Sequence, residues 1–587
     1  MPKRGGAVHV STHRRHYVGK DGVARDYETH LLRRSYRQDG KVKNETVANL
    51  SHLPAGLIEV IRASLAGQEF VPAGSAATLE RSLPHGHVAA IHAQARALGF
   101  PGLLGPAGRH RDVALALVIA RVARPGSKLA TTRWWADTTL ARDLGVADAS
   151  TDEVYAAMDW LAGRQDAIEA RLARAHLAGP GNPDRLALFD LSSSWVTGSH
   201  CPLAARGYSR DGKKGLPQIE YGLLTDPDGR PVAVRVLPGN TADPAAFTTI
   251  ASDVRDRFGL AGLVMVGDRG MITSARIEAI RGLGGFGWVT ALRAPAIAAL
   301  AADDGPLQMS LFDQVGLAEI THPDYPGERL VACRNPALAA ERARKRLALL
   351  DATEAALAPL VASVAQGRLR GADRIGLKAG RLLDKYKMAK HFDVTITDTA
   401  LALARRQRQI DAEAALDGVY VIRTSVPAAQ MGPGKVVAAY KSLSRVERDF
   451  RSLKSIDLDL RPIHHHTATR VRAHVLICML AAYLVWHLRQ AWAPLTFTDE
   501  DRPEPLDPVA PARRSTAADR KAATKTTTDD LPARSFASLL DHLGTLTRND
   551  LRYGNQDGPT VPTLAMPTPV QRRAFELLGT PIPLHLK

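Results

Sequence analysis

The sequence predicts an α/β fold built around a mixed five-stranded sheet. Three short apolar runs, at 186–190, 219–225 and 231–237, follow one another with only turns or loops between them, as the strands of a meander do. Two further apolar runs, at 263–268 and 286–292, are each preceded by a segment with helical spacing. A meander followed by helix, strand, helix and strand is typical of a layered α/β arrangement.

The composition limits the class of protein. A chain of 587 residues is too long for one hydrophobic core, and its length predicts roughly three or four domains. The 77 Lys and Arg residues outnumber the 60 Asp and Glu residues, and the resulting net charge of +17 favours a polyanionic partner. Three cysteines lie far apart in the sequence, which fits no disulfide framework and suits a reducing cytosol.

No membrane segment is expected. No secretory signal follows Met1, and the longest apolar run, 475–486, is too short to cross a bilayer. We interpret that run as a buried helix and expect a cytoplasmic protein with no membrane partner.

Residues 1–55 are predicted to form a β-rich module. Two strand-like runs, 30–37 and 41–47, flank Asp39 and Gly40, and Asp-Gly between two such runs is a strong hairpin signal. Arginine and lysine residues occur along both strands. This pattern suits contact with DNA, and equally an ordinary solvated hairpin.

Residues 56–180 are predicted to form a helical DNA-binding domain. Helical spacing of apolar residues covers 111–123, 130–144 and 151–177, with Pro and Gly at the breaks. Cationic residues gather around the first break, and this is the part that we expect to face DNA. The tryptophans nearby are better explained as core residues than as stacking platforms.

The remaining chain is predicted to be an α/β core with an insertion. The first part of the core, 181–292, includes helices at 243–258 and 273–281. The later segments are an inserted α+β domain at 293–435, a second part of the core at 436–495, and a linker with a C-terminal tail at 496–587. Within the insertion we expect a long helix at 336–365 and strands at 329–334, 392–398 and 418–424.

Two aspartates end apolar strands of the predicted sheet. Asp190 follows the first strand and Asp268 follows the fourth. If the meander supplies the second and third strands, the first and fourth run parallel, and both carboxylates emerge at one edge. A strand-end aspartate is, taken alone, more often a turn residue.

A third carboxylate, Glu447, lies on a predicted amphipathic helix. Tyr440 and Lys454 stand seven residues to either side of it, which is close to two helical turns, so the three share a stripe. A neighbouring apolar stripe is formed by Leu443, Val446, Phe450 and Leu453. Taken alone, Glu447 is better explained as a surface charge paired with Arg451, but a helix packed across the sheet edge can bring it to the two aspartates.

Three carboxylates without His or Cys ligands favour hard divalent cations such as Mg²⁺ or Mn²⁺. Two such ions per site are the usual arrangement for phosphodiester chemistry. The three histidines at 464–466 are adjacent and point in different directions, so we interpret them as a loop before the helix that follows.

As a set, these motifs resemble the DDE transposases of bacterial insertion sequences. The first acidic motif is 188–198, the second is 264–271, and the third resembles the signature Tyr-x2-Arg-x3-Glu-x6-Lys. Leu443 stands where the signature has Arg, with Arg445 close by. The resemblance extends from about residue 15 to residue 490. Within the insertion-sequence-four-like superfamily, the chain resembles the branch numbered sixteen-thirty-four.

The resemblance implies an RNase H-like core, with Asp190, Asp268 and Glu447 as catalytic metal ligands. It implies hydrolysis of a DNA strand at the end of the element, and attack of the freed 3′-hydroxyl on target DNA. Tyr440 and Lys454 would contact phosphates, and the insertion would cover the site and grip the DNA. A homodimer on double-stranded DNA, at the bacterial nucleoid, follows because two ends must be brought together.

Further DNA contacts are expected on two segments. Arg445 and Arg448 flank Glu447, and Arg210, Lys213 and Lys214 lie in the loop after the first strand. Two alternatives use the same residues: an RNase H-like nuclease that cuts without joining, and a catalytically idle DNA-binding derivative of a transposase. The intact set of three carboxylates argues against the second.

Overall fold

The chain divides into two units in the computed structural model. The first comprises residues 1–82 and 549–563, and the second comprises residues 83–548 and 564–587. The structure describes residues 7–38, 40–68, 77–213, 215–241, 243–260, 262–302, 305–307, 316–497, 520, 524–554 and 558–586. Lys214 and most of the predicted linker lie outside these residues.

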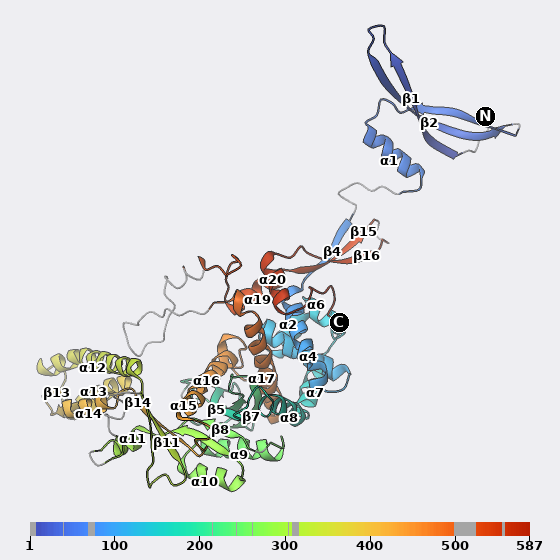
Figure 1. Cartoon of the computed structure of the whole chain (residues 1–587). Helices are drawn as coiled ribbons and strands as arrows, with labels where there is room; N and C mark the ends of the chain where they lie inside the picture. Colours follow the sequence, from blue (N-terminus) through green and yellow to red (C-terminus); the bar gives the residue numbers. More distant parts are fainter. Residues whose placement is uncertain are drawn as a thin grey trace. The chain divides into compact units, whose positions relative to one another are not determined.

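The first unit contains two small antiparallel sheets and a helix (Figure 1). Strands β1 (Ala7–Val18), β2 (Ala24–Gln38) and β3 (Lys41–Asn49) form one sheet, with helix α1 (Ala55–Leu65) after it. The predicted hairpin is therefore confirmed as β2 and β3. The sequence analysis missed β1, because its apolar alternation stops after Val10. The second sheet contains β4 (Ala77–Pro84), β15 (Thr547–Tyr553) and β16 (Thr560–Leu564).

A mixed eight-stranded sheet forms the centre of the second unit, in the order β10-β11-β14-β9-β8-β5-β6-β7. The five predicted strands are present as β5 (Leu186–Trp195), β6 (Gln218–Thr225), β7 (Pro231–Pro238), β8 (Val264–Gly267) and β9 (Gly287–Ala291). As expected, β5 pairs antiparallel with β6 and parallel with β8.

The prediction of five strands was wrong because the expected insertion extends the sheet. Strands β14 (Val419–Thr424), β11 (Arg329–Arg334) and β10 (Leu317–Ile320) add to the free edge of β9 in antiparallel fashion. This pairing satisfies backbone groups that an unpaired β9 edge would expose.

The remainder of the segment 293–435 is mainly helical and has its own hydrophobic core (Figure 1). Its elements are α11 (Ala294–Leu300), α12 (Pro336–Ala365), α13 (Ala372–Tyr386), the hairpin β12 (Phe392–Ile396) and β13 (Leu401–Arg405), and α14 (Gln407–Ala415). Leu357, Ile375 and Phe392 are almost fully buried in that core.

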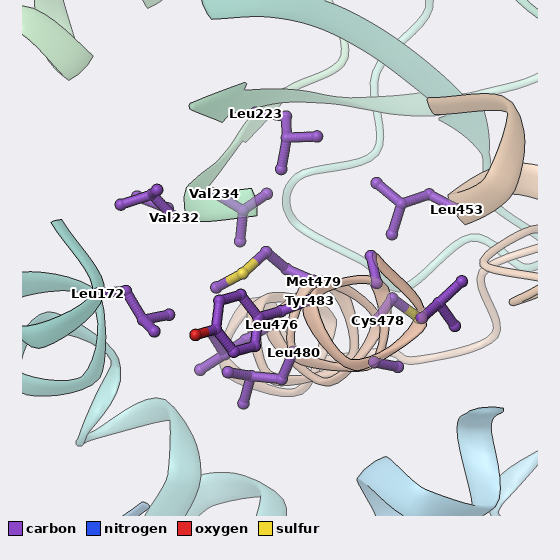
Figure 2. Packing of buried hydrophobic residues seen from close by; sticks show 14 of the residues in the cluster. Leu172, Leu223, Val232, Val234, Leu453, Leu476, Cys478, Met479, Leu480 and Tyr483 are labelled. Carbon is purple, nitrogen blue, oxygen red and sulfur yellow. The ribbon is translucent and has the colours of Figure 1, made fainter. Parts of the chain in front are cut away.

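Helix α17 (Ala468–Ala491) is the central buried helix of the second unit. Figure 2 shows Met479 of α17 pointing toward Val234 of β7, and Tyr483 of the same helix on the side of Leu172. Both α12 and α17 are long and apolar enough to cross a membrane by length and composition. Since α17 is largely enclosed by protein and α12 packs against α13, these lengths are explained by the fold.

Short helices cover α17 and the sheet. They are α2 (Gly86–Ala97), α3 (Phe100–Leu104), α4 (Arg109–Ala123), α5 (Lys128–Ala136), α6 (Thr139–Asp143), α7 (Thr151–Ala162), α8 (Gln165–His176), α9 (Asp243–Asp256) and α10 (Ser274–Leu283). The predicted helices at 130–144 and 151–177 are each divided in two. Thr138 caps the start of α6 by accepting a hydrogen bond from Leu140 N, and the break at 163–164 separates α7 from α8.

Part of the predicted tail is folded. Helices α19 (Phe536–Gly544) and α20 (Pro569–Leu577) both contact α2. Thr568 and Gln571 form a capping box at the start of α20, a sequence signal that the analysis above did not use.

Lys128 is buried in this helical region, and its titration predicts how stability depends on pH. Its ammonium nitrogen lies 3.2 Å from Nδ1 of His474, whose Nε2 lies 3.0 Å from Leu460 O. Burial, helped by the charge of Arg121, lowers the pKa of Lys128 to about 7. Between pH 7 and the ordinary lysine value, the unfolded chain binds a proton that the folded chain does not, so stability rises with pH over that window.

Lys128→Met is therefore expected to stabilise the second unit near pH 7, by roughly 2–4 kcal/mol. The gain should shrink as pH rises from about 7 to about 10, because the folded protein then holds Lys128 neutral at less cost. Thermal unfolding of both proteins across this range measures the effect. An equal gain at both ends of the range would contradict it.

Candidate functional site

The two aspartates lie next to each other where strand β8 ends. In the parallel pairing of β5 with β8, Phe189 is opposite Gly267, so Asp190 and Asp268 are the next residues along neighbouring strands. The chain turns after Asp268, whose carbonyl accepts hydrogen bonds from Met271 N and Ile272 N. Asp190 is not at a strand end as expected, because β5 continues to Trp195 in its pairing with β6.

Glu447 is on helix α16 (Leu443–Arg451), which packs against β5. Val446 and Phe450 are buried, and the ring of Phe450 lies 5.7 Å from that of Tyr221 on β6. The predicted apolar stripe is therefore confirmed. Its burial fixes the helix on the sheet while Glu447, on an exposed face, lies beside the aspartates.

The predicted stripe of Tyr440, Glu447 and Lys454 does not lie on one helix. Tyr440 is on α15 (Pro433–Lys441), which ends at Ser442, and Lys454 is in a wider π-helical turn, Ser452–Ile456. The seven-residue spacing therefore does not align the three side chains.

All three carboxylates line one cavity, with a volume of about 1590 Å³. The pKa of the Asp190 carboxyl is raised to about 7, first by burial and then by the charges of Asp268 and Glu447. A hydrogen bond from Leu191 N at 2.8 Å and the charge of Arg210 oppose this rise. The charges of Asp268 and Glu447 thus act directly on the Asp190 carboxyl.

Oxygen donors of this kind fit a hard divalent cation, which would relieve the repulsion among them. Within the described residues, no three Asp, Glu, His or Cys side chains already form a metal-binding group. The three carboxylates therefore share a cavity without forming a closed ligand set.

Tyr440 contacts the site directly. Its hydroxyl donates a hydrogen bond to Asp268 Oδ1 at 3.4 Å. Burial, followed by the charge of Asp268, raises the pKa of Tyr440, so the phenol remains a neutral donor at physiological pH. It can thus orient one carboxylate of the site.

If Asp268 binds a metal and the chain cleaves DNA, as the sequence predicts, Tyr440→Phe is expected to reduce strand cleavage by roughly 10-fold, because losing a partner of a metal ligand usually costs 10- to 100-fold. Cleavage rates and DNA affinity should be measured together. An unchanged cleavage rate with weakened DNA affinity would instead assign the hydroxyl to a phosphate contact.

Lys454 lies outside the cavity wall. Its ammonium nitrogen is 2.8 Å from Asp211 Oδ1, and Arg461 also pairs with Asp211, whose side chain is only 1% exposed. Burial lowers the pKa of Lys454. These contacts tie the loop after β5 to the segment that follows α16.

The other predicted DNA-binding residues have different surroundings. Arg445 donates hydrogen bonds to Asp228 and to Pro227 O in the turn after β6, while Arg448 is exposed. Arg210 pairs with Glu220 at 3.2 Å, and Lys213 lies over the ring of Trp195. Of these, Arg210 is near enough to Asp190 to affect its titration.

A cationic wall of the cavity was missed in the sequence analysis. It comprises Arg342, Lys345 and Arg346 of α12, Lys385, Lys387 and Lys390 at and after the end of α13, and Arg269 and Lys441, which directly follow Asp268 and Tyr440 in the sequence. Arg346 pairs with Asp417 and Lys390 with Glu413. No carboxylate partner is recorded for Arg342, Lys345 or Lys387 among the described residues, and all three are exposed. The spacing of three residues between Arg342 and Lys345 on α12 was the available signal.

Comparison with known proteins gives two family matches. A family described as "Transposase DDE domain" matches residues 182–484, and one described as "IS1634 family transposase, N-terminal domain" matches residues 20–74. No curated protein matches. Among solved structures, the chain is similar to a piggyBac transposase synaptic complex with hairpin DNA, with a TM-score of 0.34 and 8% identity over 64% of this chain and 66% of that chain.

Proposed function

The chain belongs to the DDE transposase family, in its IS1634 branch, and on that premise we propose that it binds the ends of an insertion sequence and catalyses DNA strand cleavage and strand transfer. The observation that carries this proposal is the convergence of Asp190, Asp268 and Glu447 in one cavity with a cationic wall. The strand order β7-β6-β5-β8-β9, with β8 parallel to β5, supports an RNase H-like core.

Divalent metal use accompanies this family. We propose Mg²⁺ or Mn²⁺, two ions per site, held by Asp190, Asp268 and Glu447. When bound, such ions stabilise charge on the attacking and leaving oxygens of phosphodiester chemistry. The residues supply oxygen donors only, which is what these hard cations prefer.

The protein's own groups would position the reacting DNA. Tyr440 holds Asp268 in place through its hydroxyl. Arg342, Lys345 and Lys387 would bind phosphates along the cavity wall, so the segment 293–435 would grip the element end. On β5, the hydrogen bond from Leu191 N would help to orient the Asp190 carboxylate.

The remaining DNA contacts stay proposals. Arg210 and Lys213 belong to the loop that Lys454 and Arg461 anchor through Asp211, and Lys214 is proposed from the sequence alone. Arg445, Arg448 and Lys454 would bind phosphates of the DNA strand beyond the site. Arg445 and Lys454, which pair with carboxylates, would first exchange the carboxylate for a phosphate. We also propose the domain division that the sequence predicts. It comprises an N-terminal module (1–55), a helical DNA-binding domain (56–180), a core (181–292 and 436–495), an insertion and a tail.

Two element ends must be held in one complex, so we propose a homodimer on double-stranded DNA at the bacterial nucleoid. A supercoiled plasmid that carries both ends tests the function. The full chain with Mg²⁺ should release the ends and join them to a target. Cutting without joining would favour the nuclease alternative, and binding without cutting would favour the idle derivative.

A further inference from the structure

The sheet of β1, β2 and β3 separates its charges onto two faces. Residues opposite each other on neighbouring strands point to the same face, so the register assigns each side chain to a face. Side-chain hydrogen bonds agree: Ser35 contacts Asn44 and His9, all on one face. We define the arginine face by Arg15, Tyr17, Arg25, Tyr27, Arg33 and Arg37, and no Asp or Glu of the three strands lies on it.

The opposite face carries the acidic residues of these strands, and each has a basic partner. Glu28 pairs with Arg14, Asp26 with His16 at 2.6 Å, and Glu45 with Arg34 at 3.9 Å. Helix α1 also lies on that face, because Arg62 donates a hydrogen bond to Thr12. That face thus carries helix α1 and three carboxylates beside its four Lys and Arg residues, Arg14, Arg34, Lys41 and Lys43.

The arginine face, by contrast, has positive charge without matching carboxylates. Arg25 pairs with Asp21 of the β1–β2 turn at 2.6 Å. Among the described residues, no carboxylate partner is recorded for Arg15, Arg33 or Arg37, and Arg33 Nε is buried with no hydrogen-bond partner. Tyr17 and Tyr27 between them are each 53% exposed. The exposed guanidinium groups of Arg15 and Arg37 are therefore available for the bidentate hydrogen bonds that phosphates accept.

We propose that the arginine face binds the phosphate backbone of duplex DNA. At about 3.3 Å per residue, the stretch of β2 from Arg25 to Arg37 spans about 40 Å, longer than the ~34 Å of one turn of duplex. A row of arginines without an acidic residue complements a polyphosphate along that length. The proposal rests on the proposed function only in taking DNA as the partner, and it assigns a surface apart from the carboxylate cavity.

The test compares two double variants of the full chain with equal changes in charge. Arg15→Gln with Arg37→Gln alters the arginine face, and Lys41→Gln with Lys43→Gln alters the opposite face of the same sheet. All four side chains are exposed, and thermal unfolding checks that both proteins fold. Affinity for a duplex oligonucleotide is measured between 50 and 200 mM salt, in the Asp268→Asn background so that no strand is cut.

The arginine-face variant should lower the salt slope of binding by about 1.8, from roughly 0.9 for each lost phosphate contact. The Lys41 and Lys43 variant should change it far less. Equal losses of duplex affinity in both variants, or no loss in the arginine-face variant, would overturn the proposal. It would also be overturned if the arginine-face variant lost binding to single-stranded RNA or to an acidic peptide while its duplex binding stayed intact. Failure of the unaltered chain to bind duplex at all would instead refute the proposed function.

Discussion

Replacing Asp268 with asparagine is expected to lower the rate of strand cleavage by roughly 10³-fold or more. Asparagine keeps the size of the side chain and removes the negative charge that would hold a metal. Losing even a hydrogen-bond partner of a metal ligand costs 10- to 100-fold, so losing a ligand itself costs more. Asp190→Asn and Glu447→Gln should have effects of the same size, because the three carboxylates line one cavity.

Two controls make this result specific. Asp256→Asn neutralises an exposed carboxylate at the end of α9, outside the cavity wall, and should leave cleavage unchanged. The double variant Asp190→Asn with Asp268→Asn should be no slower than either single variant, since residues that act as a unit are not additive. Retention of a tenth or more of the activity in Asp268→Asn would remove that residue from the site.

Neutralising the cationic wall should weaken DNA binding by a factor similar to the loss of cleavage expected for Asp268→Asn. Arg342→Gln, Lys345→Gln and Lys387→Gln together remove three exposed charges that line the cavity. Three lost phosphate contacts lower the salt slope by about 2.7, which near 0.1 M salt corresponds to an affinity loss of roughly 500-fold. Equilibrium titration of an element-end duplex at several salt concentrations measures both quantities.

The matched control lies on the neighbouring helix. Arg374→Gln, Lys378→Gln and Arg381→Gln change the charge of α13 by the same amount, at exposed positions that do not line the cavity. This triple variant should retain most of the affinity. Equal losses from the two triple variants would mean that DNA responds to total charge and does not enter the cavity along α12.

Local sequence patterns predicted the part of the fold that depends on neighbouring residues. The strands from β5 to β9 and the helices between them appear where alternation and helical spacing place them. The adjacency of Asp190 and Asp268 follows from that strand order alone, because a meander of three strands makes the fourth parallel to the first.

Features that depend on distant segments could not be predicted in this way. Nothing in the local pattern of β14 indicates that it pairs with β9, more than a hundred residues earlier. The same limit explains why the cationic wall was missed, since α12 and the end of α13 reach the cavity only through tertiary packing.

The prediction that Tyr440, Glu447 and Lys454 share one helical stripe was wrong for a different reason. A seven-residue spacing places side chains on one line only if the helix is continuous, and here Ser442 separates α15 from α16 while a π-helical turn follows Arg451. Lys454 consequently reaches Asp211, whereas Tyr440 still reaches Asp268.

The central claim is that Asp190, Asp268 and Glu447 together hold the metal ions. The most direct test is a crystal structure of the full chain grown with Mn²⁺, with the ions located by their anomalous scattering. Anomalous density should lie among the carboxylate oxygens of all three residues, and it should be lost in Asp268→Asn. Manganese bound elsewhere, with none beside these carboxylates, would contradict it.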